Sequence, residues 1–517
     1  MSFKTERKVG KSTYVYEVTG YRDKDGRVKQ HRKYLGVKDP KTGIVHSPRK
    51  ERWSRACAET SGVTYTVSQC LTDSHLETTL NEVFGEEVGG KVFALGTFCA
   101  TEGNPMYQYE TWAHEHESML QNAMSSQQVS TFLKALGKNE RQRSGFWAKW
   151  DSYHGKGRNL VFDITSISTY SVGQDFAEWG HNRDHESLPQ INLGMVYSDR
   201  PGMPLGYRVY PGSVGDVTTL KNLLHYLKHD LHLSHSRMVM DRGFFSSANI
   251  RNMDAGGYDY LIPVPSGTRI AKEILLQTED RFNMEGEYLN FNNRMLAYTK
   301  IRAEFAGQIH DFHVFLDFDR RRTETQTMLR KIETIEERFN GSDYRTADEV
   351  KEFINSVCSG YSRLFEIKKN RKTFSLKRNQ EAIHEFARKF GKMILLPSNY
   401  DMEPLQLLKD YFRRDGVEKF FDILKNEMDS KRGRVQSHAA LEGRLFVHMI
   451  GLIIYGAIMN RLKRNAEAMK FKMGFPEIIS NLKRLKRIHS EDGTTVLAEL
   501  TKKQKSIFQV LDINIPE

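Results

Sequence analysis

A series of short apolar runs between residues 160 and 264 constrains the fold more than any other feature of the chain. Segments rich in Gly, Pro and Asp separate the first three runs and mark turns, so the simplest interpretation is a meander of three strands. A helical periodicity then precedes two more apolar runs, which predicts a crossover helix and further buried strands of an α/β sheet. The first runs are residues 160–164, 191–197 and 205–210, the helix is 218–232, and the last runs are 237–243 and 258–264.

Two of these strands carry an aspartate toward their ends. Asp163 lies in the first run, and Asp241 lies in the run that follows the expected helix. Ligand sites of α/β sheets lie beyond the carboxyl ends of the strands, so two such carboxylates on neighbouring strands can share a divalent cation. Taken singly, each aspartate is more often a helix cap or a turn residue.

A third carboxylate comes from a helix expected over residues 403–425. At about 100° per residue, four residues of this helix fall within about 60° of one another and are expected on one face. On that face, Glu418 is suited to bind a metal ion while cationic neighbours contact phosphate oxygens. A solvated salt-bridge face contains the same residue types and is the alternative. The four residues are Tyr411, Arg414, Glu418 and Lys425.

The charge of the chain favours a polyanionic partner. The formal net charge is +12 and the pI is about 9.2. The first fifty residues contain 14 Lys+Arg and 5 Asp+Glu, so 14 − 5 = +9 of this charge lies there. Alternating apolar residues in the same segment predict a basic β-hairpin module that contacts DNA. A solvated basic face or a membrane-surface contact gives the same count of charges.

Cysteine usage and hydropathy exclude other classes of protein. The four cysteines show no C-x-x-C spacing, which argues against a zinc ribbon or a disulfide framework. No secretory signal is expected at the start of the chain. The most apolar stretch, residues 449–459, is shorter than the roughly 20 residues that a membrane helix needs, and it is expected to form a core helix.

The changes of pattern along the chain predict six segments. The insertion is expected to contain a hairpin, over residues 294–301 and 311–316, and then charged helices over residues 325–390. The segments are a basic β-hairpin module (1–50), a helical DNA-binding region (51–150), the first part of the core (151–265), an insertion domain (266–390), the second part of the core with the Glu418 helix (391–475) and a basic C-terminal tail (476–517).

Four sequence motifs resemble bacterial transposases of the insertion-sequence-4 family, in order and in spacing. In that family the catalytic glutamate lies in a Tyr-x2-Arg-x3-Glu-x6-Lys signature, which the helix around Glu418 reproduces without a gap. Two N-terminal motifs resemble the insertion-sequence-1634 branch. The resemblance covers most of the chain and is weakest at 266–390 and beyond 480. The four motifs begin at Val161 (VFDITSIS), Leu188 (LPQINLG), Pro204 (PLGYRVYPG) and Asp241 (DRGFFS), and the N-terminal motifs begin at Ser12 (STYVY) and Lys33 (KYLG).

The resemblance implies an RNase H-like catalytic core that is interrupted by an insertion domain. It implies that Asp163, Asp241 and Glu418 are catalytic and bind two Mg²⁺ ions, for which Mn²⁺ substitutes. It also implies that Tyr411, Arg414 and Lys425 hold the phosphate backbone near the scissile bond. Arg434 and His438 follow the catalytic helix and are expected to line the DNA channel, with a structural pairing as the alternative.

The activity that the resemblance implies is transposition by a DDE transposase. Such an enzyme binds the terminal inverted repeats of its insertion sequence, cleaves the DNA at the element ends and joins the 3′-hydroxyl ends to target DNA. A homodimer is expected because two ends must be cut and joined together, and the expected location is the bacterial cytoplasm, at the nucleoid. The alternatives are an RNase H-like nuclease without strand transfer and a transposase-derived DNA-binding protein that has lost catalysis. All three acids are intact, which argues against the second alternative.

One departure from the family concerns a DNA hairpin intermediate. Well-studied members use a Trp in the insertion to stack a flipped base, but this chain has no Trp between Asp241 and Glu418. Three aromatic residues are candidate replacements as stacking platforms, and each is more often the core residue of a protein hairpin. They are Phe291, Tyr298 and Phe305.

Overall fold

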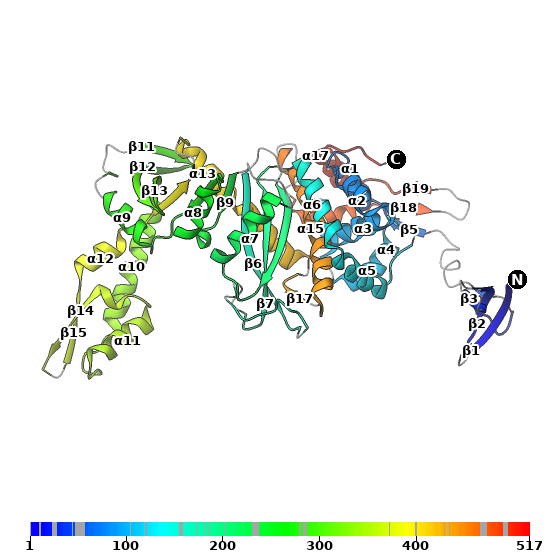
Figure 1. Cartoon of the computed structure of the whole chain (residues 1–517), viewed down its shortest axis with the longest axis horizontal. Coiled ribbons are helices and arrows are strands. Elements are labelled where there is room, and N and C mark those ends of the chain that lie inside the picture. The colour runs from blue at the N-terminus through cyan, green and yellow to red at the C-terminus, as the bar shows by residue number, and fades with distance from the viewer. Residues whose placement is uncertain are drawn as a thin grey trace. The chain divides into compact units, whose positions relative to one another are not determined.

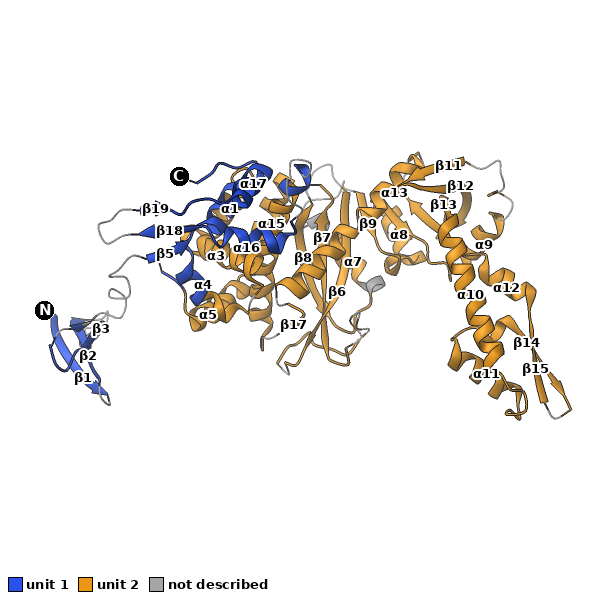
Figure 2. Cartoon of the chain, turned by 180° about the vertical axis from the view of Figure 1, so that it is seen from behind, with its two compact units in different colours: residues 1–70, 110–123, 461–517 blue, residues 71–109, 124–460 orange. Residues whose placement is uncertain are grey.

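The structure, a computed structural model, contains two compact units (Figure 2). The first comprises residues 1–70, 110–123 and 461–517, and the second comprises residues 71–109 and 124–460. The structure describes residues 2–9, 12–22, 28–43, 45–46, 57–103, 105–117, 119–120, 122–154, 159–171, 173–180, 182, 184, 186–200, 202–229, 237–278, 281–282, 287–371, 373–398, 401–428, 430–433, 435–465, 473–489 and 495–516.

A large mixed sheet forms the centre of the second unit (Figure 1). Three strands form an antiparallel meander, and two more continue the sheet beyond β6, with β9 parallel to β6 and β10 parallel to β9. β6 and β7 are buried on both faces, as expected of central strands. The predicted mixed α/β class is confirmed. The elements are β6 (Asn159–Thr169), β7 (Gln190–Ser198), β8 (Met203–Pro211), the crossover helix α7 (Asp216–His229), β9 (Arg237–Met240), α8 (Ser247–Ala255) and β10 (Tyr260–Pro263).

Helix α15 (His438–Arg464) contributes much of the core beside this sheet. It is long and apolar enough to cross a membrane, yet 72% of its most apolar window is buried inside the protein. A Cβ on Gly443 would lie 1.9 Å from the carbonyl oxygen of Leu133, so the lack of a side chain lets α5 (Ser126–Lys138) approach α15 closely. Other helices of this unit are α2 (Leu76–Phe84), α3 (Glu86–Glu102) and α6 (Glu140–His154).

The chain between β10 and the Glu418 helix adds strands to the same sheet. β13 pairs with β16, which pairs with β10, and all these contacts are antiparallel. β12 and β13 lie where the sequence predicts a hairpin. The sheet order is therefore β11-β12-β13-β16-β10-β9-β6-β7-β8. The added elements are α9 (Arg269–Gln277), β11 (Glu287–Phe291), β12 (Arg294–Phe305), β13 (Gln308–Asp317) and β16 (Lys392–Pro397).

Residues 318–390, between β13 and β16, form a helical module with its own hydrophobic core. Its helices pack Met328, Ile332 and Ile354 against Phe365 and Phe374, all of them buried. Helices alone were expected over residues 325–390, and this expectation is wrong in part, because two strands form a separate hairpin there. The elements are α10 (Phe318–Arg338), α11 (Ala347–Val357), β14 (Phe365–Asn370), β15 (Thr373–Arg378) and α12 (Gln380–Ala387).

The first unit contains two further sheets. An antiparallel four-stranded sheet near the N-terminus has Val15 and Val18 as its buried hydrophobic residues. A three-stranded sheet pairs β5 with a strand from the C-terminal region. The elements are β1 (Ser2–Val9), β2 (Ser12–Arg22), β3 (Val28–Lys38), β4 (Val45–His46), β5 (Cys57–Thr60), α1 (Gly62–Leu71), α4 (Tyr109–Glu115, from Glu110 onward), α16 (Phe475–Leu482), β18 (Lys486–His489), β19 (Thr495–Leu497) and α17 (Lys502–Leu511).

Candidate active site

Asp163 and Asp241 come from neighbouring strands of the central sheet. The last paired residues of the parallel strands β6 and β9 are Phe162 and Met240, and each aspartate is the next residue. Residues at the same level of two parallel strands point to the same face, and such strands lie about 4.8 Å apart. Asp163 is 2% exposed, and the side chain of Asp241 is 26% exposed. The sheet therefore places both carboxylates side by side, one buried and one accessible.

Arg414 connects this pair to Glu418. Its Nη1 lies 3.3 Å from Oδ1 of Asp241, and its Nη2 lies 2.8 Å from Oε1 of Glu418. The arginine side chain is 13% exposed, whereas that of Glu418 is 51% exposed. The guanidinium group thus bridges two carboxylates that are far apart in the sequence. It also packs 5.6 Å from the centre of the Tyr411 ring.

The charges of this cluster act on one another. Burial lowers the pKa of Arg414, but Tyr411 and the carboxylates of Asp241, Glu418 and Asp163 oppose it, and the pKa lies above its usual value. Burial raises the pKa of the Tyr411 hydroxyl, and the nearby carboxylates add to this while Arg414 opposes it. All three predicted catalytic acids therefore contribute to the electrostatic field around one arginine.

The helix that carries Glu418 is not continuous, in contrast to the single helix expected over residues 403–425. Tyr411, Arg414 and Glu418 nevertheless lie together, as expected. α13 (Pro404–Phe412) ends before Arg414, and α14 (Asp415–Asp422) begins after it. A π-helical turn, η5 (Ile423–Glu427), follows, in which the N–H of Met428 donates to the carbonyl of Ile423. The wider turn changes the direction of the side chains that follow Glu418, as π-bulges often do at functional sites.

Lys425 lies in this π-helical turn and forms a different contact. Its Nζ lies 2.7 Å from Oδ2 of Asp184, and its side chain is 9% exposed. His438 begins α15, 3.8 Å from Glu442, and its ring packs against Phe176 with the ring centres 4.6 Å apart. Arg434 lies outside the described residues. The expected DNA contacts of these three residues stay predictions.

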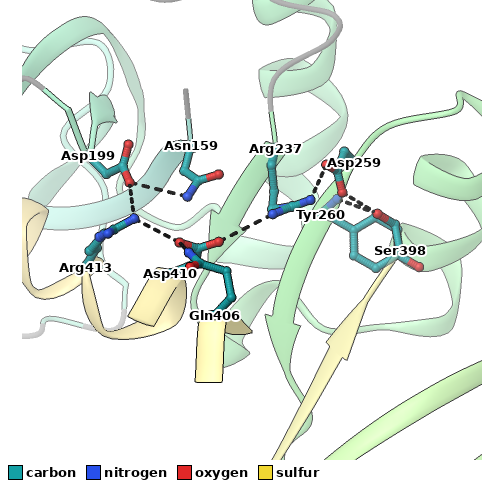
Figure 3. A network of polar contacts seen from close by, with 9 residues as sticks. All are labelled: Asn159, Asp199, Arg237, Asp259, Tyr260, Ser398, Gln406, Asp410 and Arg413. Carbon is teal, nitrogen blue, oxygen red and sulfur yellow. Dashed lines mark hydrogen bonds and ion pairs between the residues drawn. The ribbon is translucent and has the colours of Figure 1, made fainter. Parts of the chain in front are cut away.

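A network of buried charges fixes α13 to the sheet (Figure 3). Oδ1 of Asp410 accepts hydrogen bonds from Gln406 at 2.6 Å and from Arg413 at 3.0 Å, and its Oδ2 accepts one from Arg237 at 3.4 Å. Arg413 also donates to Asp199, directly after β7, at 3.2 Å. Asp410 and Asp199 are both 2% exposed. The sequence does not predict this network directly, although Asp410, the lone acid of α13 near the apolar Leu407 and Leu408, is a signal for it.

The donor set at the site fits a hard divalent cation in its chemistry. All three acids offer carboxylate oxygens, which Mg²⁺ prefers. Among the described residues, however, no three His, Cys, Asp or Glu side chains converge closely enough to hold a metal ion. The positive charge beside Asp241 and Glu418 is that of Arg414. The residues thus fit the ion, while their present arrangement is that of an internal ion bridge.

The three aromatic candidates for a stacking platform differ in their surroundings. Phe291 stacks on Phe412 with ring centres 5.2 Å apart, and both line a cavity of about 430 Å³ that also includes Asp415. Tyr298 is buried and its hydroxyl lies 2.9 Å from Nδ1 of a histidine. Phe305 stacks on a phenylalanine of the core, with ring centres 5.1 Å apart. Of the three, Phe291 alone lines this cavity.

Comparisons with known proteins give one family match. Residues 154–454, more than half of the chain, match the family described as the transposase DDE domain. The chain is also similar to a piggyBac transposase in a synaptic complex with hairpin DNA, solved by cryo-EM, with 11% identity and a TM-score of 0.39 over 81% of this chain and 79% of that chain. No curated protein matches significantly.

Proposed function

We propose that this chain, which belongs to the family of DDE transposases, moves an insertion sequence. It binds the terminal inverted repeats of that insertion sequence. The enzyme cleaves the DNA at the element ends and joins the freed 3′-hydroxyl ends to target DNA. It acts as a homodimer, because two ends must be processed together, in the bacterial cytoplasm at the nucleoid. The six segments expected from the sequence serve as its DNA-binding, catalytic and inserted parts.

The strand order supports an RNase H-like core. In β8-β7-β6-β9-β10, the first three strands along the chain form an antiparallel meander, and the fourth and fifth lie on the other side of the first. An RNase H-like sheet has this order, 3-2-1-4-5. Its first and fourth strands carry the acids, here Asp163 on β6 and Asp241 directly after β9.

The observation that carries the proposal is the contact of Arg414 with both Asp241 and Glu418. It brings the third acid to the two strand aspartates from a helix that follows a long insertion. Asp163, Asp241 and Glu418 would hold two divalent metal ions. The ions would be Mg²⁺, for which Mn²⁺ would substitute. When bound, they would activate water and then the 3′-hydroxyl for attack on phosphodiesters.

The protein's own groups position the DNA. The guanidinium of Arg414 is a planar donor that suits a phosphate as well as a carboxylate, so DNA at the site offers it a new partner. The ring of Tyr411 packs against this guanidinium and so supports its position beside the acids. Lys425, Arg434 and His438 would add contacts to the backbone further along the strand.

The proposal is tested with purified protein, Mg²⁺, a duplex that ends in the element's inverted repeat, and a target plasmid. We expect cleavage at the repeat followed by joining of its 3′ end to the plasmid, detected as a labelled branched product. Cleaved ends that never join would identify a nuclease instead. Binding without any cleavage would identify a DNA-binding protein derived from a transposase.

A further prediction follows from the ion bridge. Arg414→Gln removes the cation between Asp241 and Glu418, so the DNA-free protein should bind Mn²⁺ at least several-fold more tightly, because the metal no longer competes with an internal charge. The same change should slow DNA cleavage. Mn²⁺ binding is measured by electron paramagnetic resonance, with Arg322→Gln as the control, because it removes an arginine charge from an exposed position of α10. Equal Mn²⁺ affinities of the wild type and Arg414→Gln would contradict the competition.

A further inference from the structure

The hairpin formed by β14 and β15 has two chemically different faces. Cross-strand partners share a face of a hairpin, and successive pairs alternate between the faces. Phe365, Ile367, Phe374 and Leu376 belong to alternate pairs of one face, and they pack on the core of the helical module. This inner face holds the hairpin in place. At its edge, the N–H of Phe374 also donates to the carbonyl of Gly341.

The outer face is polar and basic. It carries the pairs Glu366 with Lys377 and Lys368 with Ser375, and both lysines are exposed. The pair next to the tip, Asn370 with Thr373, is exposed as well. Of the six Lys and Arg in residues 365–378, Lys368 and Lys377 lie on the outer face with Glu366, and Arg371 lies at the tip. Two others belong to inner-face pairs, where Arg378 pairs with Glu336 and Lys369 packs over the Phe374 ring. The Lys368 ammonium lies 3.7 Å from Glu366, and its side chain remains 60% exposed.

The tip contains a residue that is unfavourable for folding. Arg371 has φ +50°, in the left-handed region where glycine or asparagine is favoured. It is exposed and lies at the end of the strand pair. An arginine in such a turn costs stability without packing on a core. Backbone strain of this kind is a feature of functional segments.

We propose that the outer face and tip of the β14–β15 hairpin bind double-stranded DNA at a place separate from the active site. A two-stranded ribbon fits the major groove, which is about 12 Å wide. Lys368, Lys377 and Arg371 pair with phosphates, and the hydroxyl and amide groups between them donate hydrogen bonds to the backbone or to base edges. The inference rests on the proposed function, because it takes DNA as the ligand. In Figure 1 the hairpin extends away from helices α10 and α11.

The test measures binding of the full-length protein to a duplex of arbitrary sequence at several salt concentrations. The triple variant Lys368→Ser, Arg371→Ser, Lys377→Ser should lower the slope of log K against log salt by about 3, about 1 for each phosphate contact, and weaken binding roughly tenfold or more at physiological salt. The matched control is Arg269→Ser, Arg322→Ser, Lys351→Ser, which removes the same charge from exposed helix positions. Equal slopes for the two variants would overturn the proposal.

A single substitution separates binding from folding. Arg371→Gly relieves the left-handed strain, so it should raise the thermal stability of the protein and at the same time weaken DNA binding. Loss of both would indicate a structural role and overturn the proposal. Measurements on the wild type separate failure of the hairpin site from failure of the proposed function. A wild type that does not bind DNA refutes the proposed function, whereas a wild type that binds with the same salt slope as the triple variant refutes the hairpin site alone.

Discussion

Glu418→Gln is expected to reduce DNA cleavage by at least about 1,000-fold while DNA binding changes less than about twofold. The substitution removes the charge of a carboxylate that is proposed to hold metal, and a loss of about 4 kcal/mol of transition-state stabilisation corresponds to this factor. Glutamine keeps the size of the side chain, and Glu418 is half exposed, so the fold does not depend on its charge. Cleavage is measured on a labelled duplex that ends in the inverted repeat, and binding is measured by fluorescence anisotropy.

The control is Asp422→Asn on the same helix, because Asp422 is exposed and contacts Asn426 rather than the aspartates. It should retain cleavage close to that of the wild type. Asp163→Asn and Asp241→Asn should reproduce the loss. Mg²⁺-dependent cutting by Glu418→Gln at more than a tenth of the wild-type rate would remove Glu418 from the proposed metal site.

Asp410→Ala is expected to lower the free energy of unfolding of the second unit by about 2–3 kcal/mol. It removes the buried carboxylate that both Arg237 and Arg413 contact, and with it the charge-assisted hydrogen bonds of that carboxylate. Arg237 keeps Asp259 as a partner and Arg413 keeps Asp199, so neither charge is left unpaired. The two arginines are 19% and 30% exposed, so water compensates in part, and the loss lies below that of fully buried pairs. Urea denaturation followed by circular dichroism measures the change.

Asp259→Ala is the matched control, since Asp259 contacts the same Arg237 at 3.0 Å but is 35% exposed. It should cost less than about 1 kcal/mol. We also expect Asp410→Ala to slow cleavage, because α13 carries Tyr411 and leads directly into Arg414. If the two variants unfold at the same urea concentration, the network does not hold α13 to the sheet.

The sequence predicts the strands of the central sheet well, because their burial on both faces leaves continuous apolar runs. The proximity of Asp163 and Asp241 also follows from the sequence, because neighbouring parallel strands place their carboxyl ends at the same edge of the sheet. The position of Lys425 could not be predicted. Its partner Asp184 is 241 residues away in the sequence, and a π-helical turn leaves no clear mark in the periodicity.

The β14–β15 hairpin shows how a surrounding charged sequence can make a strand difficult to predict. Phe365 and Ile367 alternate with charged residues, and Phe374 and Leu376 alternate with polar ones, and this period of two indicates a strand. The runs are six residues each, and charged helices surround them, so the helical pattern dominates. These two segments form strands because the apolar residues of both pack on the core of the helical module.

The helical module leaves the sheet and returns to it at one point. The N–H of Asp317 donates to the carbonyl of Gly391 at 2.9 Å, and Gly391 has φ +69°, with its Cβ position 2.5 Å from the Asp317 oxygen. The pairing of β13 with β16 is thus complete without residues 318–390. The module is therefore separable from the sheet that holds the acids. A short turn in place of residues 318–390 should leave a folded, cleaving enzyme with weaker DNA binding.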